Sequence, residues 1–469
     1  IVSTEFQTSA EEMEFVQHVA LAAINAALSD SATKVERDAA QQYLQDLKGQ
    51  EVCMSMMLHI LTTDSADHND WNRQLALSIL DDWLKAWWNR IPEDAQRYIR
   101  DQCVTLLTSA AVAASRGLRT KLAVILCNIA CRQYPQHWPT FMDDVVGLWV
   151  STGLPAQREI CIMTLEFLVQ DCVDGDFNTS LPTQRRQEIL TGLRERLQPL
   201  LQTSHAFLTQ CAEQLQGGGG GGSAEQAAEG KALGTAALRL VVALAAFAKS
   251  GELCAPGHDL CRLTLQLLSL SALQADAVNL FHSITALKFE PQLFASVLEM
   301  IADIPVNALP ARLDDSIAFQ RVYAEGVYQL LGNNIAAAMD DKFLLKPGTE
   351  MGAVLGKYIS LMSRLLDQPS RRLAADVLGS WIRIFKERAI LRLPWAGEVM
   401  ALVLRVYYKK TMRVLWDPVT ESPESEDDQE DFDDIAEYTD FRNSVNCQLR
   451  LLADCAGRRF PGTCVCVRC

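Results

Sequence analysis

The chain of 469 residues is predicted to be all-α and built from stacked helical hairpins, and three observations carry that prediction. Apolar residues recur at helical spacing along the whole chain, alternation of β-branched residues is scarce, and proline or glycine corners divide the periodic stretches. Hydrophobic residues make up 49% of the sequence, which is ample to fill a core between helices.

The clearest helix is predicted between Ala76 and Trp87. Its apolar residues step at i, i+3, i+4, i+7, i+8 and i+11, which places them along one face of a helix. The stretches Ile99–Ala110 and Leu373–Phe385 have the same spacing. We therefore expect amphipathic helices that each bury one side against a neighbour.

Corners separate these helices, and the most informative one lies at Tyr134–Pro139. Because proline lacks a backbone N–H and disfavours helix in the residue before it, the helix through Leu122–Cys131 is expected to end here and another to begin near Pro139. Trp138 is expected to pack between successive hairpins, which is a structural role. Further corners are predicted at Ile91–Asp94, Gly153–Pro155, Ser180–Pro182, Pro256–Gly257, Pro291, Ala308–Pro310, Pro369 and Leu393–Pro394.

The distance between corners gives a period of roughly 40 to 47 residues per pair of helices, which is the period of HEAT and armadillo repeats. One such pair cannot bury its apolar face alone and therefore stacks on its neighbours. We predict a right-handed superhelical solenoid of HEAT-type helical hairpins. An irregular all-α bundle is the alternative, and a parallel sheet is disfavoured.

Charge and composition exclude several classes of protein. A net charge of −15 argues against a surface that is uniformly attractive to nucleic acid or to an anionic membrane. The most apolar run, Leu240–Ala248, is too short to cross a bilayer, so no membrane insertion is expected. Fourteen cysteines are scattered along helical stretches, as small apolar residues are, and this favours a reducing compartment.

Two segments interrupt the helical pattern. Gly217–Gly222 begins a glycine-rich linker, and its formal match to a dinucleotide-binding motif lacks a preceding strand. Glu421–Asp440 contains eleven acidic residues and no basic one, so it is expected to stay solvated until a cationic surface binds.

The sequence lacks the motifs of phosphate-binding loops, zinc proteases and serine hydrolases, so we expect no catalytic residues, no cofactor and no enzyme activity. Ser31–Lys34 matches a serine-lysine motif without its companion motifs, and His137 has no positioned partner. The pair Cys127 and Cys131 shares a helix face, yet no histidine or second cysteine pair completes a four-ligand site. Core packing is therefore preferred over a metal site.

The two ends of the chain are unusual. The chain begins at Ile1 without a methionine, and residues 457–469 form an atypical cysteine-rich tail. Cys464, Cys466 and Cys469 invite a metal-binding interpretation, but a truncated or mispredicted terminus is preferred. We expect the chain to be a fragment or a truncated gene product.

Three segments resemble one protein family. Arg132–Pro139 is similar to a segment that follows the third helical repeat in nuclear transport receptors of the importin-β/karyopherin family. Leu181–Arg186 stands about 40 residues later, as a similar turn does in one exportin branch, and Asn72–Leu80 with Tyr98–Arg100 resembles the family's amino-terminal signature. The resemblance covers about residues 35 to 210 well and is looser to about residue 455.

The resemblance implies a nuclear export receptor that shuttles between nucleus and cytoplasm. It implies cooperative binding of the small GTPase Ran in its GTP form and of a cargo, either a protein or a small structured RNA such as a pre-microRNA or tRNA. Nuclear pore proteins would be further partners, and the receptor would be a monomer. Two alternatives stay open: an importin-type receptor, in which RanGTP expels cargo, and a HEAT scaffold without transport, such as a phosphatase regulatory subunit.

Two sets of charged residues are candidate contacts. An acidic stretch that precedes a helix also occurs in the resembling receptors, so the family implies Ran contacts at Asp427, Asp428, Glu430, Asp431, Asp433 and Asp434. Arginine pairs near corners or helix ends can contact RNA phosphate, or they can complement the helix dipole and nearby acids. The phosphate candidates are Arg185, Arg186, Arg371 and Arg372.

These observations divide the chain into predicted parts. The parts are importin-β-like amino-terminal repeats (1–110), exportin-like amino-terminal repeats (111–216), the glycine-rich linker (217–230), further HEAT repeats (231–420), the acidic loop (421–440), a helix (441–456) and the tail (457–469).

Overall fold

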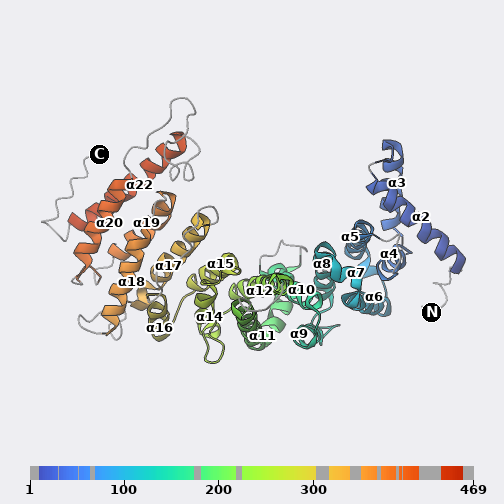
Figure 1. The fold of residues 1–469 in the computed structure, drawn as a ribbon, viewed down its shortest axis with the longest axis horizontal. Helices are drawn as coiled ribbons and strands as arrows, with labels where there is room; N and C mark the ends of the chain where they lie inside the picture. Colours follow the sequence, from blue (N-terminus) through green and yellow to red (C-terminus); the bar gives the residue numbers. More distant parts are fainter. Residues whose placement is uncertain are drawn as a thin grey trace. The chain divides into compact units, whose positions relative to one another are not determined.

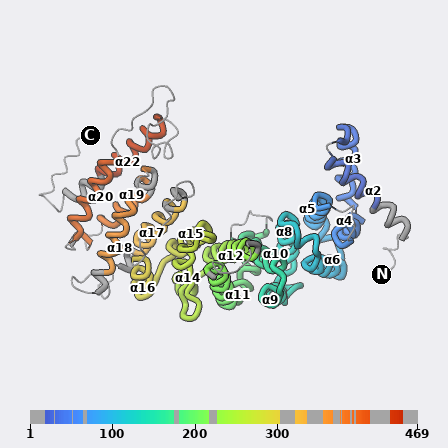
Figure 2. The backbone as a smooth tube through the Cα atoms, viewed as in Figure 1, coloured from blue at the N-terminus to red at the C-terminus, as the bar shows by residue number. Residues whose placement is uncertain are grey.

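The computed structural model shows a chain of helices, drawn in Figure 1 and traced from the N-terminus to the C-terminus in Figure 2. It describes residues 10–29, 31–50, 52–63, 69–173, 181–217, 224–302, 316–338, 350–366, 371–386, 390–392, 395–410 and 435–457. Every regular element in these ranges is a helix, which confirms the predicted all-α class. The chain divides into two compact units, of which the first comprises Ile1–Thr203 with Ala224–Leu244 and the second Ser204–Ser223 with Ala245–Cys469.

The first unit contains the amino-terminal hairpins. Its elements are α2 (Ala10–Leu28), α3 (Lys34–Lys48), α4 (Val52–Thr62), α5 (Asp70–Trp87), η1 (Trp88–Arg90), α6 (Glu93–Thr105), η2 (Leu106–Thr108), α7 (Ala110–Ala114), α8 (Arg116–Gln133), α9 (Phe141–Ser151), α10 (Pro155–Val173), and most of α11 (Thr183–Gly217) and α12 (Ala224–Ala245).

Hairpins in this unit stack through one row of helices. Helix α4 pairs with α5, α6 with α8, and α9 with α10, while α5 packs on α8 and α8 packs on α10 (Figure 1). The row α5, α8 and α10 is strongly buried: most residues of α10 and of the second half of α8 are buried. Because each hairpin covers its neighbour, the arrangement is that of HEAT-type repeats.

The second unit repeats this plan with two rows of helices. Its elements are the end of α11, α13 (Ser250–Leu253), α14 (Leu260–Leu267), α15 (Gln274–Thr285), α16 (Pro291–Ala302), α17 (Ser316–Ala338), α18 (Glu350–Leu366), α19 (Arg371–Lys386), η5 (Ile390–Arg392), α20 (Ala396–Lys410) and α22 (Ile435–Gly457). Helices α15, α17, α19 and α22 pack in sequence, and α14, α16, α18 and α20 form the other row (Figure 2).

The predicted amphipathic stripes are found in these helices. In α5 the residues Ala76, Ile79, Leu80, Trp83 and Leu84 are all buried, as the spacing predicts, and Trp87 is half-buried. In α19 Val377, Trp381, Ile384 and Phe385 are likewise buried. None of the helices in the described ranges has the length and apolarity that a membrane span requires.

Two helices differ from the expected pattern. The stretch Ile99–Ala110 is not one helix, because α6 ends at Thr105 and the short turn η2 carries Leu106 and Leu107 into the core before α7 begins. Helix α11 continues through Pro199, although proline removes one helical hydrogen bond. Spacing alone therefore predicts which residues are buried better than where a helix ends.

Candidate functional site

The corner between α8 and α9 is the best defined local structure that the sequence singled out. Helix α8 ends at Gln133 and α9 begins at Phe141, as the two prolines predict. The carbonyl of Gln133 accepts hydrogen bonds from the backbone N–H groups of His137 (2.7 Å) and Trp138 (3.1 Å). These bonds close the corner and turn the Trp138 side chain back toward the hairpin.

Trp138 is buried in this corner, with an exposed fraction of 5%. Its indole N–H donates to Oδ2 of Asp144 (2.9 Å), which also accepts from the hydroxyl of Thr140 (2.8 Å). The indole meets the Phe141 ring edge to face, with centroids 4.9 Å apart, and the Arg100 guanidinium lies 5.1 Å from the indole centroid. The predicted packing role of Trp138 between hairpins is thereby confirmed.

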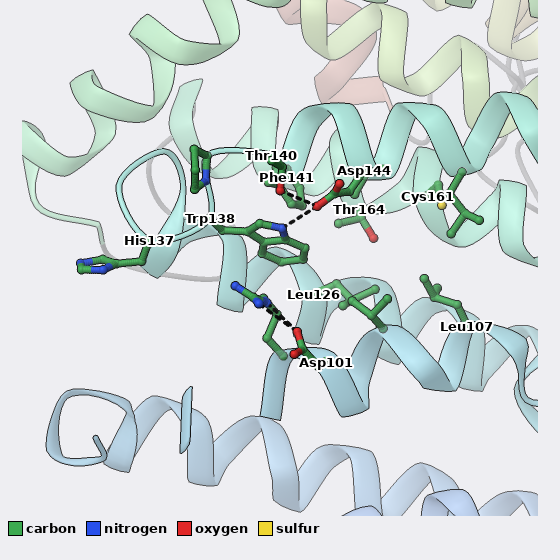
Figure 3. Close-up of a pocket in the computed structure, with 15 residues that line it drawn as sticks. Asp101, Leu107, Leu126, His137, Trp138, Thr140, Phe141, Asp144, Cys161 and Thr164 are labelled. Carbon is green, nitrogen blue, oxygen red and sulfur yellow. Dashed lines mark hydrogen bonds and ion pairs between the residues drawn. The ribbon is translucent and has the colours of Figure 1, made fainter. Parts of the chain in front are cut away.

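A cavity of about 250 Å³ lies beside Trp138 (Figure 3). Its walls come from α6, η2, α8, the corner, α9 and α10, and they are mainly apolar. Figure 3 shows Trp138 between Asp144 on one side and Asp101 on the other, with Leu126 and Leu107 farther in. An apolar hollow with a few polar groups at its rim has the general character of a ligand or peptide-binding pocket.

Arg185, at the start of α11, ties the corner to the next hairpin. Its Nε donates to the carbonyl of Cys131 (3.0 Å), one Nη donates to Gln136 and to Oε2 of Glu188 (3.0 Å), and the other donates to the carbonyl of Tyr134. The hydrogen bond from Arg185 is the main cause that lowers the pKa of Glu188. Arg185 thus donates hydrogen bonds to carbonyl groups at the end of α8 that lack partners within the helix. Cations are favoured at helix C-termini for this reason.

Tyr134 fits closely against the same helix. It is buried, burial raises the pKa of its hydroxyl, and the ring lies 5.6 Å from Phe141 between centroids. Gly192 in α11 allows this approach, since a Cβ added there would lie 2.5 Å from the Tyr134 hydroxyl oxygen. Glycine is needed at this position because the tyrosine occupies the space of a side chain.

A second cluster lies between α8 and α10. Cys127 and Cys131 of α8 and Asp171 of α10 are fully buried and face one another. The hydrogen bond with Cys131, followed by burial and the charge of Asp171, raises the pKa of the Cys127 thiol well above its usual value. In the ranges that the structure describes, this is the one group of three His, Cys, Asp or Glu side chains whose possible ligand atoms all lie within 4.8 Å of one another.

The predicted charged candidates fall in different parts of the chain. The acidic candidates from Asp427 to Asp434 and the cysteine tail lie outside the described residues. Arg185 and Arg186 lie together at the start of α11 and are half-buried, whereas Arg371 at the start of α19 donates to the carbonyl of Lys410. The side chain of Arg372 lies outside the described part. Of the acidic segment, the last six residues form the first turns of α22.

Sequence reasoning missed two features of this site. Asp171 is 44 residues from Cys127 and 40 from Cys131, and nothing local marks it as their partner. Arg185 reaches a corner 51 residues before it. Both contacts follow from stacking of α8, α10 and α11, which places residues one repeat apart in contact; a search at a spacing of one repeat is the signal that could have found them.

Two family models match successive parts of the chain. The model described as importin-beta N-terminal domain matches residues 40–109, and that described as exportin 1-like protein matches residues 115–281. Together the two matches take up about half of the chain and run from α3 into α15. The chain belongs to the exportin and importin-β family. Members of this family are nuclear transport receptors and not enzymes, which bears out the expectation that the chain is not an enzyme.

Individual members of the family are similar over shorter or longer parts. Exportin-5 of Homo sapiens is 22% identical over 403 residues, which cover 83% of this chain and 33% of that protein. Exportin 1A of Arabidopsis thaliana is 30% identical over 34% of this chain and 15% of its own length, and importin-13 of Homo sapiens is 30% identical over 24% and 11%. The chain thus spans about a third of the length of exportin-5.

Among solved structures, an engineered protein is similar over 96% of this chain and 97% of its own, with 12% identity and a TM-score of 0.42. The helices of this chain itself show its fold class.

Proposed function

We propose that this chain acts in nuclear export, as the part of an exportin-5-like receptor that binds RanGTP together with a cargo. The observation that supports this most is the pair of family matches, which cover residues 40–109 and 115–281, from α3 into α15. The similarity to exportin-5, which extends over most of this chain, favours export over import. The cargo class we propose is a protein or a small structured RNA such as a pre-microRNA or tRNA.

The mechanism we propose depends on changes in the curvature of the solenoid. Each hairpin contacts mainly its neighbours, so small rotations between hairpins add up to a change in curvature. If RanGTP and cargo both favour one curvature, each raises the affinity for the other by the same factor. Hydrolysis of GTP on Ran would remove this coupling and release both ligands. Contacts with nuclear pore proteins and shuttling between nucleus and cytoplasm belong to the same proposal, as does a monomeric receptor.

The charged candidates have different parts in this proposal. The acids between Asp427 and Asp434 would attract a basic surface of Ran over a distance and speed the encounter. Arg186, Arg371 and Arg372 are proposed as RNA phosphate contacts. Arg185 is proposed with them. Its donors are directed to the corner at Tyr134, and Arg371 donates to the carbonyl of Lys410, so a phosphate contact by either arginine would require a change of partners. The division of the chain into repeats, linker, acidic loop, helix and tail is likewise retained as a proposal.

The central test compares the nucleotide states of Ran. We expect the chain to bind RanGTP at least about tenfold more tightly than RanGDP, which corresponds to about 1.4 kcal/mol. Isothermal titration with Ran locked in each state measures this ratio. Equal affinities would remove the transport proposal and favour a scaffold without Ran binding.

A second test addresses the acidic segment. Neutralising Asp427, Asp428, Glu430, Asp431, Asp433 and Asp434 to the corresponding amides should slow RanGTP association and flatten its salt dependence, because long-range attraction acts on the rate of encounter. Stopped-flow binding at low and high salt measures both effects. Neutralising Glu299 and Glu398, which are exposed in α16 and α20, provides the control. Association of the six-residue variant at the parent's rate in low salt would contradict the proposal.

An importin-type receptor is the second candidate, and the importin-beta N-terminal match and the similarity to importin-13 favour it. The two candidates differ in the sign of coupling. For an export receptor RanGTP raises cargo affinity, whereas for an import receptor it lowers it. Measuring binding of a structured RNA with and without RanGTP distinguishes them.

A further inference from the structure

Three buried ligand atoms converge between α8 and α10. The Sγ atoms of Cys127 and Cys131 are 4.0 Å apart, and they lie 3.7 Å and 3.8 Å from Oδ2 of Asp171. Each of the three residues has an exposed fraction of 0%. The two cysteines are four residues apart on one helix, and the aspartate comes from the helix packed against it.

We propose that Cys127, Cys131 and Asp171 form a binding site for a zinc ion that joins α8 to α10. Zinc is bound at about 2.3 Å by thiolate sulfur and at about 2.0–2.2 Å by carboxylate oxygen. A point equidistant from the three atoms lies about 2.2 Å from each, as the sides of their triangle require. The three side chains therefore need to move by only a few tenths of an ångström.

The donor set selects the ion. Two thiolates favour a soft or borderline cation, whereas magnesium and calcium take oxygen ligands alone. Copper in its monovalent state favours sulfur over a carboxylate, and zinc accepts both. Zinc also accepts the tetrahedral geometry that three protein ligands and one water molecule provide.

The balance of charge and protons is consistent with zinc. Binding breaks two S–H bonds, forms two Zn–S bonds and one Zn–O bond to the Asp171 carboxylate, and releases two protons to solvent, without any oxidant or reductant. Two thiolates and one carboxylate would leave one negative charge beside Zn²⁺. Arg132 follows Cys131 directly in α8 and is half-buried, so its guanidinium can balance that charge.

The site would act as a clamp between two neighbouring hairpins. Helices α8 and α10 belong to successive hairpins of the first unit, and the cysteines and the aspartate lie toward the ends of these helices, near the corner at Tyr134. An ion that binds only the folded state stabilises it in proportion to its concentration over the dissociation constant. The proposal is independent of Ran and cargo binding.

Cadmium is a suitable probe, since it takes the place of zinc and its thiolate complexes absorb in the ultraviolet. The purified full chain is stripped of metal under a reductant that does not chelate, then titrated with Cd²⁺. We expect the parent to bind one equivalent of Cd²⁺ more than the variants Cys131→Ala and Asp171→Asn do. This additional equivalent should be accompanied by a thiolate-to-cadmium charge-transfer band. Either substitution should weaken this uptake at least about tenfold. The other cysteines of the chain cancel in the difference.

Cys161→Ala is the matched control, because Cys161 is a buried cysteine of α10 outside the cluster. It should bind Cd²⁺ as the parent does. Zinc should also raise the melting temperature of the parent and of Cys161→Ala, but not that of Asp171→Asn. Asparagine has nearly the same shape as aspartate, so Asp171→Asn tests the site even if Cys131→Ala fails to fold. Equal uptake by parent and cluster variants, or a zinc-independent melting temperature in the parent, would overturn the proposal.

Discussion

Two tryptophans, one in each compact unit, donate their indole N–H to different kinds of hydrogen-bond acceptor. Trp138 donates to Asp144, whose side chain is exposed, and it lines a cavity. Trp381 in α19 is fully buried and donates to the hydroxyl of Tyr328 (3.0 Å), which is itself buried. The corner between α8 and α9 thus gives its tryptophan a charged acceptor at the surface, whereas the contact between α17 and α19 gives Trp381 a neutral, buried acceptor.

The surroundings of Trp381 extend this difference. The Tyr328 hydroxyl donates to the carbonyl of Met362 (2.6 Å), and that of Tyr358 donates to the carbonyl of Val327 (2.5 Å). Burial raises the pKa of both tyrosines well above the usual value. The Trp381 indole stacks on Phe385 with centroids 5.6 Å apart. These groups are removed from water, so a lost partner there is not replaced by solvent.

Trp381→Ala tests the fully buried tryptophan and should have the largest effect. Removing a large aromatic from a closed site costs its transfer free energy and leaves a cavity, so we expect a loss of about 5 kcal/mol in the stability of the second unit. Hydrogen exchange of α17 and α19, followed by mass spectrometry, measures this. Trp381→Phe, which keeps most of the volume, is the control. Unchanged exchange in these helices would mean that neighbouring side chains fill the space left by Trp381 without loss of stability.

Trp138→Ala tests the corner and should cost less, about 3 kcal/mol, because the existing cavity already deprives the indole of part of its contacts. Exchange should rise first in α8 and α9, since the corner joins them. Trp138→Phe separates the loss of packing from the loss of the hydrogen bond to Asp144. A Trp138→Ala variant that exchanges like the parent would indicate that the corner adds little stability and favour a partner-binding role for it.

Gly192→Ala tests how closely the corner is packed. The added Cβ would lie 2.5 Å from the Tyr134 hydroxyl oxygen and 2.9 Å from the ring, so we expect a loss of about 2 kcal/mol from overpacking. Gly147→Ala in α9 is the matched control, because a Cβ there meets nothing within 4 Å. That control should gain about 0.5–1 kcal/mol from helix propensity. Equal melting temperatures for the two variants would contradict the close contact at Tyr134.

The sequence predicted most of the fold because the local spacing of apolar residues determines which side of each helix is buried. The spacing in Ala76–Trp87 determines which residues of α5 are buried, and the prolines around Trp138 determine where α8 ends. The break of Ile99–Ala110 into α6, η2 and α7 was not predictable in the same way. Leu106 and Leu107 are adjacent, and both are buried only because a tighter turn follows α6.

The candidate sites were less predictable because their contacts join residues one repeat apart. The partner of Cys127 and Cys131 is set by the register in which α10 packs on α8, and no local motif records that register. Arg185 was likewise predicted either as a phosphate contact or as a complement to the helix dipole and nearby acids, whereas stacking directs it to the carbonyls of Cys131 and Tyr134. Local chemistry identifies residue types, but the pairing of hairpins decides what they contact.

Effects no larger than that of Gly192→Ala should come from removing the hydrogen-bond partners of the two indoles. Tyr328→Phe leaves the Trp381 N–H buried without its acceptor, so we expect a loss of about 2 kcal/mol. Asp144→Ala removes the acceptor of Trp138 at an exposed rim, where water from the adjacent cavity can replace it, and should cost about 1 kcal/mol or less. Hydrogen exchange of the two hairpins measures both losses, and Tyr408→Phe, at an exposed tyrosine, controls for the change of residue type. A larger loss for Asp144→Ala than for Tyr328→Phe would show that the corner depends on its charged partner more than burial implies.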